Sequence, residues 1–242
     1  MTPGPAAVTI DPEERSGSGG NVRRFPYRGL PGRFSVLLAL LVIYLLCYPF
    51  VLDGNYWNLM GVLAGLAVIA AMYSLSDHRK WWLFGIVLAA PALVHHFSLK
   101  PELTSSVDVF GLVCSVLFDA FITVFILYVI FGHKTIRRET IFGALSAYLA
   151  IGFAFGNIYR VLVHYRPASI YLDPLVNAHK VAQRADLIYY SFSSLTCLGA
   201  SGFVPADSYA RALTSFESVL GVMYLAVLVA RLIGLHTSQQ RA

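Results

Sequence analysis

The pattern of hydrophobic and polar positions divides the chain into long apolar runs that are separated by shorter polar segments. Residues 34–52 contain no charged side chain before the polar turn at Asp53, and the run is close to the roughly 20 residues that a helix needs to cross a bilayer. Residues 57–75 repeat the pattern, and residues 81–97 form a shorter third run that contains Pro91. These runs predict three membrane-spanning helices.

Three further apolar runs follow. Residues 107–131 are long enough to span a membrane although they contain Asp108 and Asp119. Residues 141–165 and 212–235 form the fifth and sixth runs. The pattern therefore predicts an all-α membrane protein with six transmembrane helices, joined by one unusually long connection between the fifth and the sixth.

Composition narrows the class of protein. Of the 242 residues, 57% are hydrophobic and only 13% are charged, against the roughly 25% charged residues of a soluble globular domain. This excludes an ordinary soluble enzyme. Lys and Arg exceed Asp and Glu by 18 to 13, but a basic balance on so apolar a chain indicates membrane topology rather than nucleic-acid binding. The three cysteines form no paired motif, so no disulfide or metal site is expected.

The positions of Lys and Arg predict the orientation in the cell membrane. Basic residues cluster before the first run, between the second and third, and between the fourth and fifth, whereas the loops after the first and third runs offer only Lys100. Because Lys and Arg concentrate in cytoplasmic loops, both termini are expected inside and the connection 166–211 outside. Residues 1–33 are rich in Pro, Gly and Ser and are expected to form a disordered cytoplasmic N-terminus.

The long connection contains a segment that is too short to cross a membrane. Residues 186–195 are rich in aromatic and hydroxyl side chains, and residues 196–202 (TCLGASG) are interrupted by glycine. Irregular backbone at membrane depth is tolerated only where it lines a water-filled cavity or is buried in protein. We therefore expect a re-entrant half helix whose C-terminal dipole end favours a cation, followed by a pore-lining loop.

Residues 189–205 (YYSFSSLTCLGASGFVP) resemble the pore region of potassium channels, where the family has the pattern T-x-T-T-V-G-Y-G-D-x-x-P. The two align without a gap on Thr196 and Pro205. In that alignment the family's second Thr, Val, Gly, Tyr, Gly and Asp correspond to Cys197, Leu198, Gly199, Ala200, Ser201 and Gly202. Gly221 falls where such channels often carry a hinge, and the sixth run resembles the inner helix of prokaryotic six-span members.

The resemblance implies a homotetramer in the lipid bilayer, in which four loops surround one axis and their carbonyl oxygens replace the hydration shell of K⁺. Residues 141–235 would form the pore domain, made of outer helix, pore helix, filter and inner helix. Residues 34–132 would form a four-helix domain like S1–S4, and residues 236–242 a short cytoplasmic tail. The family implies no enzymatic activity and no cofactor beyond the permeant monovalent cations; an accessory protein partner is left open.

The filter departs from the family in its backbone requirements. Consecutive carbonyls point to one side only if some residues adopt left-handed dihedrals, which a side chain penalises by roughly 1 kcal/mol or more. Gly199 can adopt them, and Ser201 is expected to do so at a cost. Gly202 stands where the family has an Asp that hydrogen-bonds behind the filter.

The side chains of the filter differ as well. Cys197 places a thiol, a weak ligand for hard alkali cations, where the family has a hydroxyl. Ala200 removes the Tyr that would pack against the pore-helix aromatics, here Tyr189 and Tyr190. Three outcomes stay open: a cation channel with reduced K⁺ selectivity, a reshaped filter that conducts poorly, and K⁺ selectivity retained by the backbone alone.

The leading hypothesis is a tetrameric pore for monovalent cations, with altered or reduced K⁺ selectivity. The alternative is a non-conducting pore-fold protein that acts as a membrane scaffold or partner-binding module. A transporter or membrane enzyme is disfavoured because the chain has one re-entrant segment and no internal repeat. Voltage gating is not expected, because residues 107–131 contain no Lys or Arg.

Three acidic residues lie in the apolar runs. Asp108 and Asp119 are separated by eleven positions, hence about 20° around a helix, and form one acidic stripe that should face protein. Pairing with Arg160 or with a hydroxyl of a neighbouring helix is expected for them. Glu217 is expected to be a satisfied polar group between the inner helix and the pore helix.

Overall fold

The structure, a computed structural model, describes residues 32–53, 57–74, 79–97, 106–132, 138–175 and 182–240. Nearly all of the segment that was predicted to be disordered, residues 1–33, lies outside these ranges. The described residues form helices and two short strands. In chain order these are α1 (Arg33–Asp53), α2 (Trp57–Ser74), α3 (Arg79–Phe97), α4 (Ser106–Gly132), α5 (Arg138–Tyr165), β1 (Ile170–Leu172), α6 (Arg184–Leu195), β2 (Phe203–Pro205) and α7 (Ser208–Gln240).

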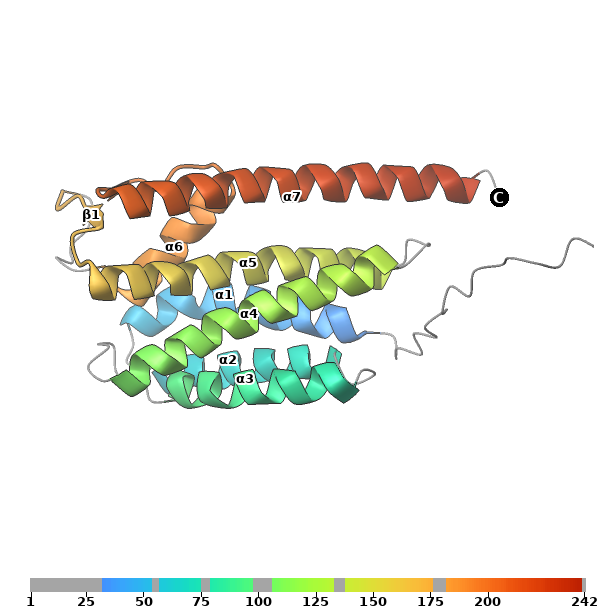
Figure 1. Cartoon of the computed structure of the whole chain (residues 1–242), viewed down its shortest axis with the longest axis horizontal. Helices are drawn as coiled ribbons and strands as arrows, with labels where there is room; N and C mark the ends of the chain where they lie inside the picture. Colours follow the sequence, from blue (N-terminus) through green and yellow to red (C-terminus); the bar gives the residue numbers. More distant parts are fainter. Residues whose placement is uncertain are drawn as a thin grey trace, which may run out of the picture.

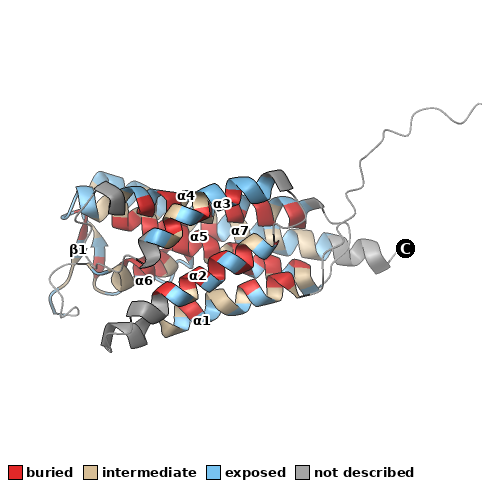
Figure 2. Ribbon diagram, turned by 90° about the horizontal axis from the view of Figure 1, so that it is seen from below, coloured by how far each residue is buried: buried red, intermediate tan, exposed pale blue. Residues whose placement is uncertain are grey.

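Helix α5 lies at the centre of the arrangement. In Figure 1, α7 runs along one side of α5, the helices α1 to α4 lie on the other side, and the short α6 slants between α5 and α7. Buried residues follow α5 along its length (Figure 2). One apolar core joins α5 to α1, α2, α3 and α4, and a second joins it to α6, α7 and both strands.

Within the described residues, three helices are long and apolar enough to cross a membrane, namely Val109–Phe131 in α4, Arg138–Tyr165 in α5 and Ser208–Gly234 in α7. The described apolar stretches of α1, α2 and α3 are shorter, at 10–17 residues. All six predicted apolar runs are helical to within a few residues. The all-helical membrane architecture is thus supported, while the crossing of all six helices stays a prediction.

Helix α7 is longer than the sequence pattern predicts. It begins at Ser208 rather than at residue 212, because the carboxylate of Asp207 accepts a hydrogen bond from the backbone N–H of Ala210 at 2.7 Å and so caps the first turn. It also continues to Gln240. The helix thus includes most of residues 236–242, a stretch that contains no Gly or Pro to end it, and the location of this tail in the cytoplasm stays a prediction.

The two strands were not predicted. They pair antiparallel, with Ile170 opposite Pro205 and Leu172 opposite Phe203. Each strand has only three residues, which is too short for an alternating pattern to stand out from the sequence. Their pairing fastens the segment that follows residues 196–202 to the segment that follows α5.

The first turn of α1 is capped by a carboxylate from α5. The backbone N–H groups of Gly32 and Phe34 donate to the two carboxylate oxygens of Glu139 at 2.9 Å and 3.1 Å. The first turn of a helix leaves its N–H groups without partners within the helix. Glu139 provides those partners from more than 100 residues away, and it thereby fixes the end of α1 against α5.

We expect Glu139→Ala to lower the free energy of unfolding by about 1–2 kcal/mol, the usual cost of losing a helix cap. Thermal unfolding in detergent, followed by circular dichroism, measures this change. Arg138→Ala is the matched control, because Arg138 is the exposed neighbour of Glu139. Equal unfolding temperatures for the two variants would contradict the capping role.

Candidate functional site

The site is built on the short helix α6. Its 12 residues, at about 1.5 Å rise per residue, reach roughly halfway across a hydrocarbon core. The helix starts with a capping box, in which the backbone N–H of Gln183 donates to Asp186 at 2.8 Å. One face of the helix is buried between α5 and α7, so a short, packed helix is present where the half helix was predicted, and its re-entry into a membrane stays a prediction.

The last four carbonyl oxygens of α6 all have hydrogen-bond donors. Such groups have no partner within the helix itself. The donors come from the following loop, from α5 and from α7: Thr196 N–H to Phe192 (3.1 Å), Leu198 N–H to Ser193 (2.9 Å), the Ser218 hydroxyl to Ser194 (2.9 Å) and the Tyr148 hydroxyl to Leu195 (3.3 Å). The end of α6 is therefore held by both flanking helices where the loop begins.

The loop of residues 196–202 is exposed on the single chain and irregular in backbone. Thr196 through Gly199 are exposed, and Leu198 reaches 79% exposure. Cys197 and Gly199 adopt left-handed dihedrals, with φ of 56° and 83°. Two left-handed residues two positions apart fit a backbone whose carbonyls turn toward one side. At Cys197, which has a side chain, this conformation carries a cost.

The expectation that Ser201 would be left-handed was wrong. The left-handed residue at this end of the loop is Gly202, with φ of 79°. Gly202 has no Cβ, so it adopts this conformation without the penalty that Ser201 would bear. Its carbonyl oxygen accepts a hydrogen bond from the backbone N–H of Asp173 at 2.9 Å, next to β1. The loop is thus tied down where it meets β2.

The two tyrosines of α6, Tyr189 and Tyr190, have different surroundings. Tyr190 is buried at 2% exposure and packs edge-on against Tyr159, with ring centroids 4.9 Å apart. Tyr189 is 47% exposed. Both rings contact Phe203, at 5.8 Å and 6.2 Å between centroids. The two tyrosines therefore contact the chain three residues beyond Ala200, at Phe203, which was not identified from the sequence, and their role as filter support stays a prediction.

Glu217 joins α7 to both other helices of this region. Its side chain is fully buried, the hydroxyl of Tyr159 in α5 donates to Oε2 at 2.6 Å, and the hydroxyl of Ser191 in α6 lies 2.5 Å from Oε1. Glu217 is therefore a satisfied polar group between α7 and α6, as expected, and it also contacts α5. The partners Tyr159 and Ser191 were not predicted, because nothing in the sequence marks their helix faces.

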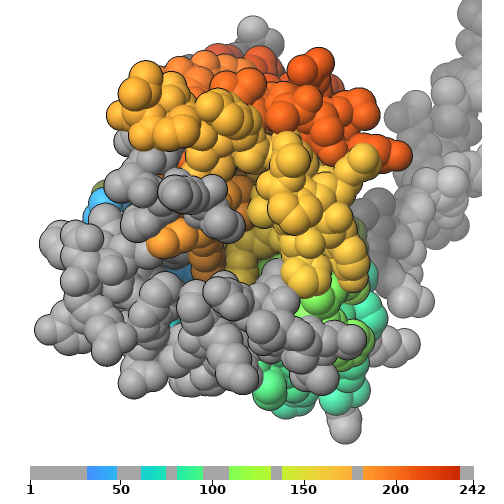
Figure 3. Space-filling model, turned by 90° about the vertical axis from the view of Figure 1, so that its left-hand side faces the viewer, coloured from blue at the N-terminus to red at the C-terminus, as the bar shows by residue number. Residues whose placement is uncertain are grey.

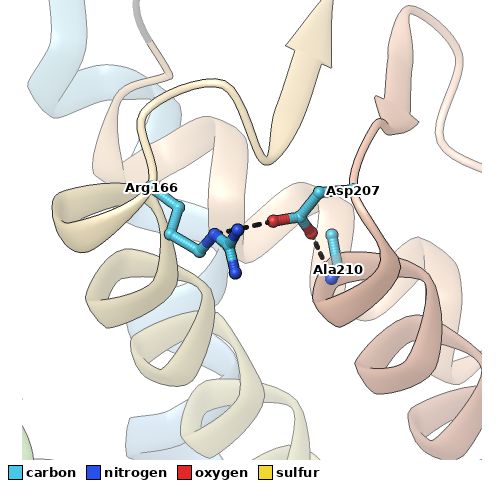
Figure 4. A network of polar contacts seen from close by, with 3 residues as sticks. All are labelled: Arg166, Asp207 and Ala210. Atoms are coloured by element: carbon cyan, nitrogen blue, oxygen red, sulfur yellow. Dashed lines mark hydrogen bonds and ion pairs between the residues drawn. The ribbon is translucent and has the colours of Figure 1, made fainter.

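An ion pair holds the end of the loop region that leads into α7. The Arg166 guanidinium lies 3.0 Å from the Asp207 carboxylate, which also caps α7 at Ala210 (Figure 4). The guanidinium also stacks over the ring of Tyr209, 4.4 Å from its centroid. Seen end on, the segment after α5 and the start of α7 lie together at this end of the molecule (Figure 3). Sequence reasoning did not identify this pair.

Of the two acidic residues in α4, the structure describes the side chain of Asp119. The Asn157 side-chain amide in α5 donates to the carboxylate of Asp119 at 3.2 Å. The predicted partner was Arg160 or a hydroxyl; the observed donor is an amide one turn before Arg160. The amide is neutral, and the guanidinium of Arg184 at the start of α6 acts electrostatically on the same carboxylate. The side chain of Asp108 lies outside the described residues.

Gly221 marks the closest approach of α7 to α6. A Cβ atom added at Gly221 would overlap the carbonyl oxygen of Leu195, the last residue of α6. Helix α7 is continuous across this position. The structure thus supplies a packing reason for a glycine here, and the predicted hinge at Gly221 stays a prediction.

We expect Gly221→Ala to cost about 2 kcal/mol or more of folding stability, because the overlapping atom belongs to the backbone and cannot rotate away. Gly234→Ala is the matched control, since a Cβ there meets nothing within 4 Å. Thermal unfolding of both variants in detergent measures the effect. A Gly221→Ala variant that unfolds with the wild type, yet conducts differently, would favour a hinge over close packing.

The comparisons with known proteins agree with this geometry. Residues 144–237 match the model of a family described as "Ion channel". The match begins within α5, includes α6 and residues 196–202, and ends in α7. No curated protein and no solved structure matches the chain. This part of the chain is therefore similar to an ion channel domain, which supports ion conduction in a membrane rather than enzymatic activity.

Proposed function

We propose that four copies of this chain surround one axis and conduct monovalent cations down their gradient, with altered or reduced selectivity for K⁺. The loop of residues 196–202 would be the filter, and α5, α6 and α7 its outer, pore and inner helices. The match to an ion channel family over this region supports the proposal. The permeant ions are the substrate, and no cofactor is required.

The observation that carries the proposal is the exposed left-handed backbone at Cys197 and Gly199, between two helices that fix its start. Backbone polar groups at membrane depth need partners, which a hydrated ion path supplies. One chain contributes a single such loop, so a closed path needs several copies.

The exposure of α7 also favours assembly. Only 11% of the most apolar stretch of α7 is buried within one chain, whereas 67% of the corresponding stretch of α5 is buried. The α7 faces of neighbouring copies, together with lipid, would cover this apolar surface. In this arrangement α1 to α4 form a surrounding domain without gating charges, and both termini lie in the cytoplasm, as the distribution of Lys and Arg predicts.

Purified protein in liposomes should pass K⁺ or Na⁺ when a gradient of that ion is imposed. Ag⁺ applied from the inner side should block this flux through the Cys197 thiol, and Cys197→Thr should abolish the block, because a hydroxyl binds Ag⁺ weakly. Cys114→Ser is the control, since Cys114 is buried in α4. Flux that is absent in both gradients and unchanged by Cys197→Thr would overturn the proposal.

One observation favours the alternative, a pore-fold protein that does not conduct and serves as a membrane scaffold. The left-handed position lies at Gly202 instead of Ser201, so the alternation seen at Cys197 and Gly199 is not continued. A ring of carbonyls would then be incomplete at its outer end, and ion binding there would weaken.

The triple variant Ala200→Tyr, Ser201→Gly, Gly202→Asp separates the two functions. If the native chain is a non-conducting scaffold, the triple variant should create K⁺ flux in liposomes where the wild type shows none, because it restores the ring brace, the glycine and the carboxylate. The single variant Ala200→Tyr is the control. Substantial cation flux through the wild-type protein would exclude the scaffold reading.

A further inference from the structure

A buried carboxyl group joins three helices beside the loop. Glu217 of α7 is fully buried, and its two oxygens contact Tyr159 of α5 and Ser191 of α6. The titratable groups that interact with it are phenols, from Tyr148 and Tyr159 in α5 and Tyr190 in α6. Within the described part of the chain, no Lys, Arg or His contacts Glu217.

The Ser191 hydroxyl lies between two acceptor oxygens. The hydroxyl carries one proton but lies within hydrogen-bond distance of both, the Gly152 carbonyl at 2.8 Å and Oε1 of Glu217 at 2.5 Å. One proton cannot make two full hydrogen bonds. If Oε1 carries a proton, Glu217 donates to Ser191 and Ser191 donates to Gly152, and each short contact contains one hydrogen.

The hydrogen bonds near Oε2, the other carboxyl oxygen of Glu217, are consistent with this assignment of protons. The Thr214 hydroxyl donates to the Ala210 carbonyl at 2.8 Å, so the Tyr190 hydroxyl, 2.6 Å from Thr214, donates to Thr214. Tyr159 then donates to Oε2 of Glu217 at 2.6 Å. The Tyr159 hydroxyl also lies 3.4 Å from the Thr214 hydroxyl, and its one proton is assigned to the shorter contact with Glu217, so Glu217 accepts at Oε2 and donates from Oε1.

We infer that Glu217 is held as a neutral carboxylic acid, that it is a positioning residue linking α7 through α6 to α5, and that removal of its proton lowers conduction at alkaline pH. The conduction part of this inference rests on the proposed function. A buried carboxylate without a cationic partner is costly, whereas a neutral acid with one donor and one acceptor is satisfied.

Loss of the proton would act on the loop through α6. When Glu217 is ionised, the Ser191 hydroxyl turns to donate its hydrogen bond to the carboxylate. The hydrogen bond from Ser191 to the Gly152 carbonyl is then lost. Ser191 lies one turn before Leu195, where α6 ends and the loop begins. A weaker link between α6 and α5 therefore shifts or loosens the start of the proposed filter.

The first test compares cation flux through wild type, Glu217→Gln and Glu217→Leu in liposomes from mildly acidic to strongly alkaline pH. Glutamine donates from its amide nitrogen and accepts at its oxygen, as the neutral acid does, so its flux should stay within about twofold of wild type and lack the alkaline loss. The cation flux through Glu217→Leu should fall about tenfold or more, because the hydroxyls of Tyr159 and Ser191 lose a buried hydrogen-bond partner.

Two results would overturn the inference: flux through Glu217→Gln that falls with wild type at alkaline pH, or a loss in Glu217→Gln as large as in Glu217→Leu. If Glu217→Leu does not assemble, as judged by gel filtration, the comparison of wild type with Glu217→Gln still decides.

Infrared spectroscopy gives a readout that is independent of conduction. The carbonyl band of a protonated carboxylic acid should be present in wild type at neutral pH and reduced in Glu217→Gln. Asp119→Asn tests whether the other carboxyl group between the helices contributes, and Asp207→Asn is the control for an ion-paired carboxylate. An unchanged band in Glu217→Gln would refute the neutral acid. If no variant conducts in any gradient, the proposed function fails, and the infrared band still decides the state of Glu217.

Discussion

The hydrogen bonds at the C-terminal end of α6 fix the position of the loop and of both helices that flank it. Ser218 of α7 and Tyr148 of α5 donate to the carbonyls of Ser194 and Leu195, and α7 approaches so closely that only a glycine fits at position 221. Because both flanking helices hold the same end, α6 cannot move without disturbing one of them. The loop therefore starts from a defined place and direction.

The other end of the loop is held by different contacts. The pairing of β1 with β2 and the hydrogen bond from Asp173 to Gly202 fasten it to the segment after α5. The ion pair between Arg166 and Asp207 fastens the start of α7 to the end of α5. A seven-residue loop anchored at both ends has few backbone conformations left, which is how a non-glycine residue such as Cys197 can be kept left-handed.

The sequence predicted the elements far better than their contacts. Long apolar runs are visible because lipid demands them, and α6 was identified because ten aromatic and hydroxyl-rich residues cannot cross a bilayer. The contacts of Glu217 with Tyr159 and Ser191 could not be predicted. Contacts between distant helices depend on how each helix is rotated about its axis and how deep it lies, and the apolar pattern indicates neither. The left-handed residue was misplaced by one position, since the penalty at Ser201 is avoided by a glycine next to it. Asp207 before α7 carried a capping signal that could have predicted the earlier start of the helix.

In the proposed channel, residues 196–202 of several copies face one shared path. A density map of the purified protein in lipid nanodiscs would show whether they do. We expect four copies around an axis, with the backbone at Cys197 and Gly199 turned toward it and α7 covered by its neighbours. A monomer, or an assembly in which this loop faces lipid or solvent away from any axis, would rule out such a path.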